Sequence, residues 1–139
     1  MTPENFKIIT QNCFFGRIAV GLTALINQES PDIFCLQEVT SNNLAEQIKS
    51  EIGYDYKITQ PNQSVIPGLS FRNSTYSNLL IVDSGELNWA KSKRTWIEPF
   101  GGKSLWVDVQ MGRQKLRVYN CYFSVIDQGM VERGKMWEI

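Results

Sequence analysis

A continuous apolar run, Ile33-Phe34-Cys35-Leu36, is the feature that most limits how this chain of 139 residues can fold. The run is short and follows a helix that periodic apolar residues predict over Arg17–Gln28. Apolar residues without alternation are typical of a strand that is buried on both faces. Because a further strand is predicted over Phe6–Cys13, the order strand, helix, strand predicts a parallel pair in an α/β domain.

The remaining segments predict a second helix and four more strands. The helix covers Asn43–Ile52, with Ser41 or Asn42 as its cap and Gly53 at its end. The predicted strands are Tyr54–Ile58, Leu79–Val82, Ser104–Val109 and Lys115–Phe123. We expect the last two strands to form a hairpin, which makes the second half of the domain antiparallel.

Two further segments carry no strand pattern. Gln60–Tyr76 contains two prolines and a glycine and predicts a loop, whose unusual length suggests a function. Met130–Ile139 predicts the start of a helix.

Composition excludes several kinds of chemistry. Histidine is absent, so the chain has no Ser-His-Asp or Cys-His nucleophile pair and no zinc site with imidazole ligands. The three cysteines, Cys13, Cys35 and Cys121, lie in apolar runs and predict buried, reduced thiols, as is usual in the cytoplasm. Fourteen Lys and Arg balance fourteen Asp and Glu, so no overall field attracts nucleic acid. With no signal peptide or membrane span predicted, we expect a cytoplasmic protein.

Two polar residues stand at the carboxyl ends of the predicted parallel strands, Asn12 and Glu38. Open α/β sheets build their sites at this edge, so the two side chains are expected to lie close together. A carboxylate and an amide oxygen suit a magnesium ion, which keeps water or phosphate oxygens at its other positions. The alternative is that Glu38 follows its strand into solvent and Asn12 caps a turn.

The segments Lys7-Ile8-Ile9-Thr10-Gln11-Asn12 and Pro31-Asp32-Ile33-Phe34-Cys35-Leu36-Gln37-Glu38-Val39 carry a pattern known from one family. Tyr76-Ser77-Asn78-Leu79-Leu80-Ile81 and Leu116-Arg117-Val118-Tyr119-Asn120-Cys121-Tyr122-Phe123 match two further strands in the same order. Arg133–Trp137 matches the helix that follows them. On these motifs the chain resembles the N-terminal half of the endonuclease/exonuclease/phosphatase superfamily.

The resemblance implies both a fold and an activity. The fold is half of an α/β/β/α sandwich of the DNase I-like type, a mixed β-sheet with helices on one face, formed by residues 1–139 as one domain. Members hydrolyse phosphoesters in DNA, RNA, inositol phosphates or sphingomyelin with magnesium and an activated water. The chain is thus expected to act on a nucleic acid or a small phosphoester.

Four residues inherit roles from the resemblance. Glu38 is the direct ligand of Mg (or Mn), and Asn12 belongs to the surroundings of the metal. Tyr122 stands where other branches carry histidine, and its phenol can hydrogen-bond a phosphate oxygen. Asn120 shares a strand face with Tyr122, and it either supports Tyr122 in catalysis or serves as a structural amide.

The departures from the family pattern lead to a second hypothesis. The sequence has no counterpart of the Gly-Asp-x-Asn motif or of the terminal Asp-His pair, so we expect an incomplete or inactive hydrolase. The alternative function is a non-catalytic binding or assembly module. A half sandwich would expose one sheet face, which predicts either a homodimer through that face or a missing C-terminal half.

A mixed basic and aromatic segment offers one route to nucleic acid. Lys91, Lys93 and Arg94 lie between Trp89 and Trp96, a combination that can bind single strands by stacking and phosphate contacts. The alternative is a solvated loop with its tryptophans anchored in the core.

Overall fold

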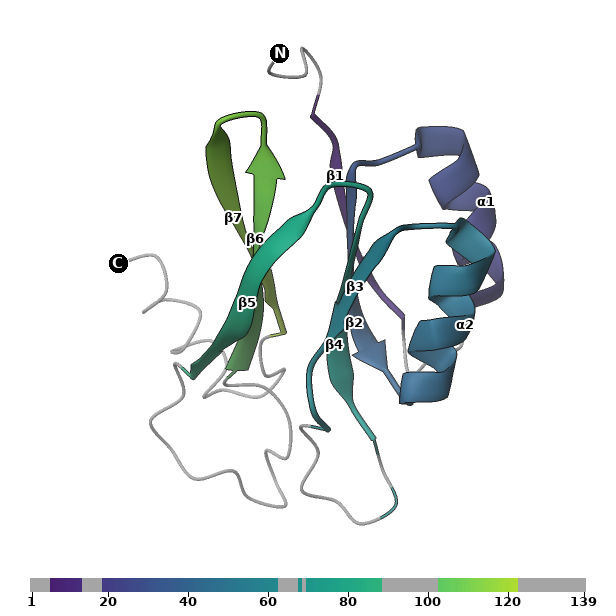
Figure 1. The fold of residues 1–139 in the computed structure, drawn as a ribbon. Coiled ribbons are helices and arrows are strands. Elements are labelled where there is room, and N and C mark those ends of the chain that lie inside the picture. The colour runs from purple at the N-terminus through teal and green to yellow at the C-terminus, as the bar shows by residue number, and fades with distance from the viewer. Residues whose placement is uncertain (1–5, 14–18, 63–67, 69, 89–102, 123–139) are drawn as a thin grey trace.

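The computed structural model of the protein describes residues 6–13, 19–62, 68, 70–88 and 103–122, which Figure 1 shows as three layers. The outer layer holds the helices α1 (Ala19–Glu29) and α2 (Asn42–Ile52). The middle layer is a sheet of β1 (Ile8–Asn12), β2 (Ile33–Val39), β4 (Arg72–Ser77) and β3 (Tyr56–Thr59), in that order. The third layer is a sheet of β5 (Ile81–Asn88), β6 (Lys103–Met111) and β7 (Gln114–Cys121).

The first sheet is mixed, and both helices pack on its outer face. β1 and β2 are parallel, with Ile8 opposite Ile33 and Asn12 opposite Gln37, whereas β4 is antiparallel to both of its neighbours. This arrangement confirms the predicted α/β class, the parallel pair and the placement of helices on one face. Neither described helix, each of 11 residues, is long and apolar enough to cross a membrane.

Helix α2 begins and ends at the residues that its capping chemistry requires. Ser41 is the cap, because its hydroxyl oxygen accepts a hydrogen bond of 3.0 Å from the backbone N–H of Leu44. Gly53 ends the helix in the left-handed conformation, with a φ of 71°, and its N–H donates to the carbonyl of Lys49. Of the two predicted caps, the structure therefore selects Ser41 over Asn42.

The loop predicted over Gln60–Tyr76 is wrong in its second part, because β4 lies there as a central strand of the first sheet. Its residues are almost all buried although most are polar. Asn73 and Thr75 hydrogen-bond toward the second sheet, and Ser74 pairs with Thr59 of β3 at 3.0 Å between hydroxyl oxygens. Buried hydrogen bonds thus replace the apolar alternation by which a strand is recognised.

The second sheet is antiparallel throughout and includes the predicted hairpin. β6 and β7 pair from Ser104 opposite Cys121 to Met111 opposite Gln114, and Gly112 in the turn has a φ of 59°. β5 starts at Ile81, so the strand predicted over Leu79–Val82 begins later and extends further than expected. The helix start predicted over Met130–Ile139 lies outside the described residues.

The two sheets pack face to face around a shared apolar cluster. Its buried members are Ile33, Cys35, Val107, Val109 and Val118, and the first two come from β2. The inner face of the first sheet is therefore covered by a sheet of the same chain. This corrects the argument for a homodimer, which assumed that the face would be exposed.

The outer side of the second sheet is held by a stacked set of side chains. The guanidinium of Arg117 lies 3.9 Å from the centre of the Trp106 ring and donates to both carboxylate oxygens of Asp108, at 2.7 and 2.8 Å. Gly85 lies opposite Trp106 in the sheet, and an added β-carbon there would stand 2.6 Å from Cζ2 of the ring. A side chain at Gly85 would therefore require the Trp106 ring to shift from its contact with Arg117.

We expect Gly85→Ala to lower the free energy of unfolding by roughly 1–3 kcal/mol, the usual cost of overpacking. Chemical denaturation with urea measures the change. Ser84→Ala, at the neighbouring position of β5, is the control and should change the free energy by less than about 0.5 kcal/mol. A Gly85→Ala variant as stable as the wild type would contradict the packing of Trp106 described above.

Candidate functional site

The carboxyl ends of β1 and β2 bring Asn12 and Glu38 into direct contact. The Asn12 side-chain N–H donates a hydrogen bond of 2.8 Å to Oε1 of Glu38. Parallel pairing explains the contact, because Asn12 lies opposite Gln37 and both strands end at the same edge of the sheet. The structure thus joins the two residues predicted for the metal site, while their roles toward a metal stay predictions.

Glu38 reaches this edge through a β-bulge. Leu36 pairs with Ser74 and Val39 pairs with Arg72, so the two residues between them on β2 face a single residue of β4. Glu38 is the second bulge residue and has a φ of 61°, a left-handed conformation that costs an L-residue roughly 1–2 kcal/mol. Its side chain is nevertheless buried, at 6% exposure.

Tyr122 reaches the same carboxylate from the second sheet. It directly follows β7, and burial, the negative charge of Glu38 and a hydrogen bond to Glu38 together raise the pKa of its phenol to about 12. Its ring packs edge-on against Phe71, with 4.7 Å between the ring centres. Three chain segments from two sheets therefore meet around Glu38, and Tyr122 keeps its proton at neutral pH.

Asn120 lies deeper between the sheets, at 2% exposure. Its side-chain N–H groups donate to the carbonyls of Leu36 and Ser74 at 3.1 and 3.0 Å, and to the Thr75 hydroxyl at 3.3 Å. Its Oδ1 accepts a bond of 2.7 Å from the side chain of Gln37. These bonds are those of a structural amide, and a part for Asn120 in the chemistry itself stays a prediction.

Gln37 was not predicted as a site residue, although its amide joins three strands. Its Nε2 donates to Thr10 of β1 at 2.9 Å and to Asn120 of β7. The signal was available in the strand faces, because Gln37 shares a face with Cys35 and Asn120 shares one with Val118, both of which belong to the buried cluster. A polar residue in a core-facing position, just before a polar strand end, is that signal.

The donor set fits a hard cation that keeps much of its own water. Glu38 supplies one carboxylate, and the described residues contain no cluster of three or more Asp, Glu, Cys or His side chains that would cage an ion. Magnesium is commonly bound in this way, through one or two carboxylates with water and phosphate completing its shell. Burial, and then the charge of Glu38, raise the pKa of the nearby Cys13 thiol to about 12, so oxygen is the relevant donor.

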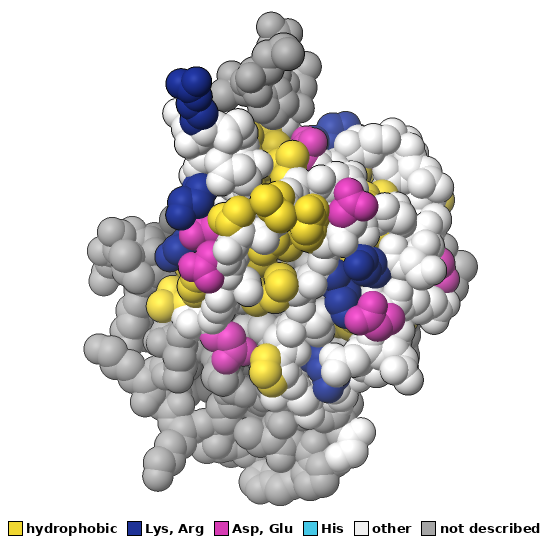
Figure 2. Space-filling model, viewed as in Figure 1, with side chains coloured by type: hydrophobic (Ala, Val, Ile, Leu, Met, Phe, Trp, Pro, Cys, Tyr) yellow, Lys and Arg dark blue, Asp and Glu magenta, His cyan; other side chains and the backbone are white. Residues whose placement is uncertain are grey.

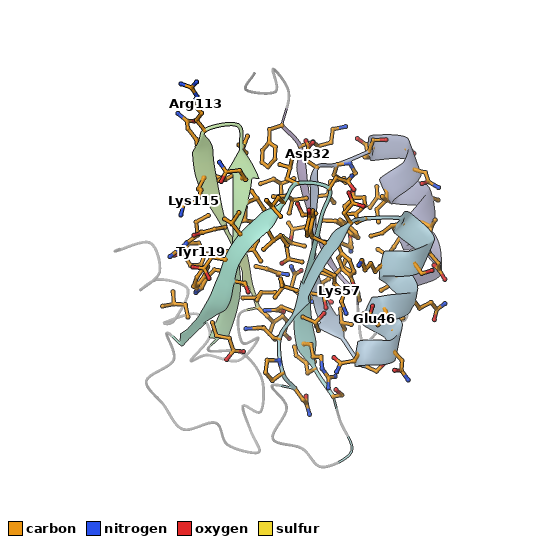
Figure 3. The ribbon with its side chains drawn as sticks, in the orientation of Figure 1. Asp32, Glu46, Lys57, Arg113, Lys115 and Tyr119 are labelled. Carbon is orange, nitrogen blue, oxygen red and sulfur yellow. The ribbon has the colours of Figure 1, made fainter. Side chains whose placement is uncertain are left out.

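The other predicted contacts to nucleic acid are not described. Lys91, Lys93, Arg94, Trp89 and Trp96 lie outside the described residues, as do Arg133 and Trp137. Among the described residues, exposed cationic and aromatic side chains lie on β7 and in the turn before it. Figure 3 shows Arg113, Lys115 and Tyr119 pointing away from the first sheet.

The opposite end of the molecule from Glu38 carries a different surface. In Figure 2 hydrophobic side chains gather near the connection from β4 to β5, where Leu80 is 48% and Val82 43% exposed.

Comparison with known proteins supports the fold and gives no assignment from sequence. No protein-family model matches the chain, and no curated protein does. Solved structures do match: an endonuclease/exonuclease/phosphatase from Bacteroides vulgatus has a TM-score of 0.69, with 11% identity over 96% of this chain and 58% of its own. An endonuclease/exonuclease/phosphatase family protein from Leptotrichia buccalis has a TM-score of 0.67, with 14% identity over 95% of this chain and 63% of its own.

A third structure of the same fold is D. rerio TDP2, complexed with a single-strand DNA product. It has a TM-score of 0.69 and 16% identity, over 96% of this chain and 52% of its own. The chain thus has the endonuclease/exonuclease/phosphatase fold, as its motifs indicated, and it spans between about half and two thirds of the length of these solved structures.

The strain at Glu38 predicts an unusual order of stability. Glu38→Ala and Glu38→Gly both remove the carboxylate, but only glycine adopts the left-handed conformation without penalty. We expect the glycine variant to be more stable than the alanine variant by about 1 kcal/mol in urea denaturation. At Leu87, in the extended strand β5, the order should be reversed; a less stable Glu38→Gly would contradict the bulge geometry.

The raised pKa of Tyr122 predicts a pH dependence. A phenol that ionises near pH 12 in the fold and near 10 when unfolded contributes stability that is complete below pH 10 and is lost as the pH rises toward 12. The phenolate absorbance of the wild type minus that of Tyr122→Phe isolates this titration. Its midpoint should fall in Glu38→Gln, because the negative charge is removed, and a wild-type midpoint near 10 would contradict the contact with Glu38.

Proposed function

Because the chain has the fold of endonuclease/exonuclease/phosphatase proteins, we propose that it is the metal-binding part of a metal-dependent phosphoester hydrolase of nuclease or phosphatase type. One observation carries the proposal. Asn12 donates to Glu38 at 2.8 Å at the end of the parallel strands, and Tyr122 of the other sheet bonds to the same carboxylate. Such a convergence of polar groups at a sheet edge is typical of sites in this class of fold.

The residues have distinct parts in this proposal. Glu38 binds a magnesium or manganese ion, and Asn12 fixes the orientation of its carboxylate. The ion supplies charge neutralisation at phosphate and a water of lowered pKa. Tyr122 holds its proton up to about pH 12, and its one O–H turns from Glu38 to a phosphate oxygen when phosphate binds.

Turnover needs groups that this sequence does not contain. The Gly-Asp-x-Asn and Asp-His motifs have no counterpart in the 139 residues, and histidine is absent. Removing several groups that act together lowers rates by orders of magnitude. We therefore propose that this chain alone binds metal and phosphate but hydrolyses phosphoesters weakly or not at all, unless a further segment completes the site.

A nucleic acid is the substrate class that the comparisons favour over a small phosphoester. The neighbour TDP2 was solved with a single-strand DNA product, and TDP2 shares this fold. Tyr122, in place of the histidine of other branches, points the same way. A cytoplasmic location is also proposed, because all three cysteines are free thiols.

Isothermal calorimetry with magnesium and manganese tests the metal site. We expect the wild type to bind one of these ions and Glu38→Gln to lose the binding, because the variant keeps the size of the side chain but not its charge. Glu46→Gln is the matched control, since Glu46 is an exposed carboxylate of α2 that pairs with Lys57 (Figure 3), and it should bind as the wild type does.

The outcomes separate the two candidate functions. No binding by the wild type, or unchanged binding by Glu38→Gln, would overturn the metal role of Glu38. Metal binding without hydrolysis of single-stranded DNA is expected of both candidate functions for this chain alone, whereas metal-dependent hydrolysis that Glu38→Gln abolishes would favour the enzyme.

A further inference from the structure

Beneath the three site residues lies a second set of three, one from each of the same strands. Thr10 stands two residues before Asn12 on β1, Gln37 stands one residue before Glu38 on β2, and Asn120 stands two residues before Tyr122 on β7. The second set lies before the carboxyl ends of the strands, where the site residues are. Its members bond to one another across the sandwich.

Gln37 is the centre of this set. Both hydrogens of its amide are used, one toward the Thr10 hydroxyl at 2.9 Å and one toward Oδ1 of Asn120 at 2.7 Å. Gln37 is 8% exposed and Asn120 only 2%, whereas Thr10 lies on the exposed edge strand. The bond to Asn120 is therefore the more protected of the two.

Asn120 also hydrogen-bonds to the backbone of both strands next to the bulge. Its amide donates to the carbonyls of Leu36 and Ser74, which are the last regular pair before the bulge that contains Glu38. Its own carbonyl accepts a bond of 3.1 Å from Asn73, the residue that faces the bulge from β4. β7 is thus tied to β2 and β4 at the point where their pairing becomes irregular.

Directional bonds are needed here because the rest of the interface is apolar. The cluster between the sheets consists of side chains such as Ile33, Val107 and Val118, and apolar contacts do not by themselves fix how one sheet lies along the other. Buried hydrogen bonds do, since an unmatched polar group between the sheets is costly. The offset of the sheets decides whether Tyr122 meets Glu38.

We propose that Thr10, Gln37 and Asn120 are positioning residues, which hold Asn12, Glu38 and Tyr122 in the arrangement that binds the metal. The inference rests on the proposed function for the metal, but the arrangement itself can be tested without one. None of the three is placed to touch the metal or the phosphate, and each acts through the site residue that follows it.

Gln37→Met tests the centre of the set, because methionine has a similar size and makes none of these bonds. We expect the dissociation constant for Mn²⁺ to rise about 10- to 100-fold, the usual effect of losing groups that orient a metal ligand. Thr10→Val should weaken binding by less, because its bond is partly exposed, and Thr10→Ser should restore the affinity by restoring the hydroxyl.

Ser77→Ala is the control for a merely structural effect. Ser77 is buried at the other end of β4, opposite Ile33, and its hydroxyl makes two bonds of 2.9 Å with the backbone of Leu79. Its loss should lower the urea midpoint while leaving Mn²⁺ affinity at the wild-type value. Gln37→Met with wild-type affinity, or Ser77→Ala with the same loss of affinity as Gln37→Met, would overturn the proposal.

Crystal structures of the variants separate this proposal from the proposed function. If the wild type binds no Mn²⁺, the proposed function fails, and the positions of the side chains decide the present inference. The Asn12 to Glu38 bond of 2.8 Å should persist in Ser77→Ala and be broken in Gln37→Met. An intact bond in Gln37→Met would overturn the inference; if that variant does not fold, the pair Thr10→Val and Thr10→Ser decides it by the same two measurements.

Discussion

The irregular pairing of β2 with β4 determines where the carboxylate of Glu38 lies. In a regular strand Glu38 would share a face with Leu36, which packs among the residues under the helices, and Val39 would point to the other sheet. The bulge places both Leu36 and Val39 in the helix-side core and releases Glu38 to the end of the sheet. The backbone strain at Glu38 is offset by two buried apolar side chains, and the acidic group becomes available to Asn12 and Tyr122.

Polar groups hold the two sheets together at the same end of the sandwich. Apolar residues pack around Ile33 and Val107, whereas Gln37 and Asn120 form a hydrogen-bonded layer next to the site. The position of this layer has a physical reason, since the hydrogen bonds of Glu38 with Asn12 and Tyr122 require a fixed offset between the two sheets. Apolar contacts thus hold the two sheets together, and hydrogen bonds fix their relative position next to the site.

Local patterns were sufficient to predict much of this structure. The parallel pair of β1 and β2, the limits of α2 at Ser41 and Gly53, and the hairpin at Gly112 depend on periodicity and capping, which are visible in a single sequence. The proximity of Asn12 and Glu38 follows from the parallel pair. β4 could not be predicted, because its residues are polar and are buried only through bonds to other strands.

Features that depend on tertiary pairing were also beyond the sequence. Neither Gln37 nor Glu38 indicates a bulge by itself, because the bulge depends on how β2 pairs with β4. The covering of the first sheet by the second depends in turn on how the two sheets pack. Tyr122 was predicted from a resemblance, but its bond to Glu38 required the offset between the sheets. The residues missed, Thr10 and Gln37, act through bonds that span strands.

The hydrogen bond between Gln37 and Asn120 joins residues that are 83 positions apart in the chain, and the bond from Asn120 to Leu36 spans 84. Closing so long a loop has a large conformational entropy cost. Strands joined by a short turn, such as β6 and β7, pair at a smaller cost. Because loop closure must precede such contacts, we expect them to form later than the local hairpin and helices. The groups that surround Glu38 are then expected to take up their arrangement late in folding, after the secondary structure has formed.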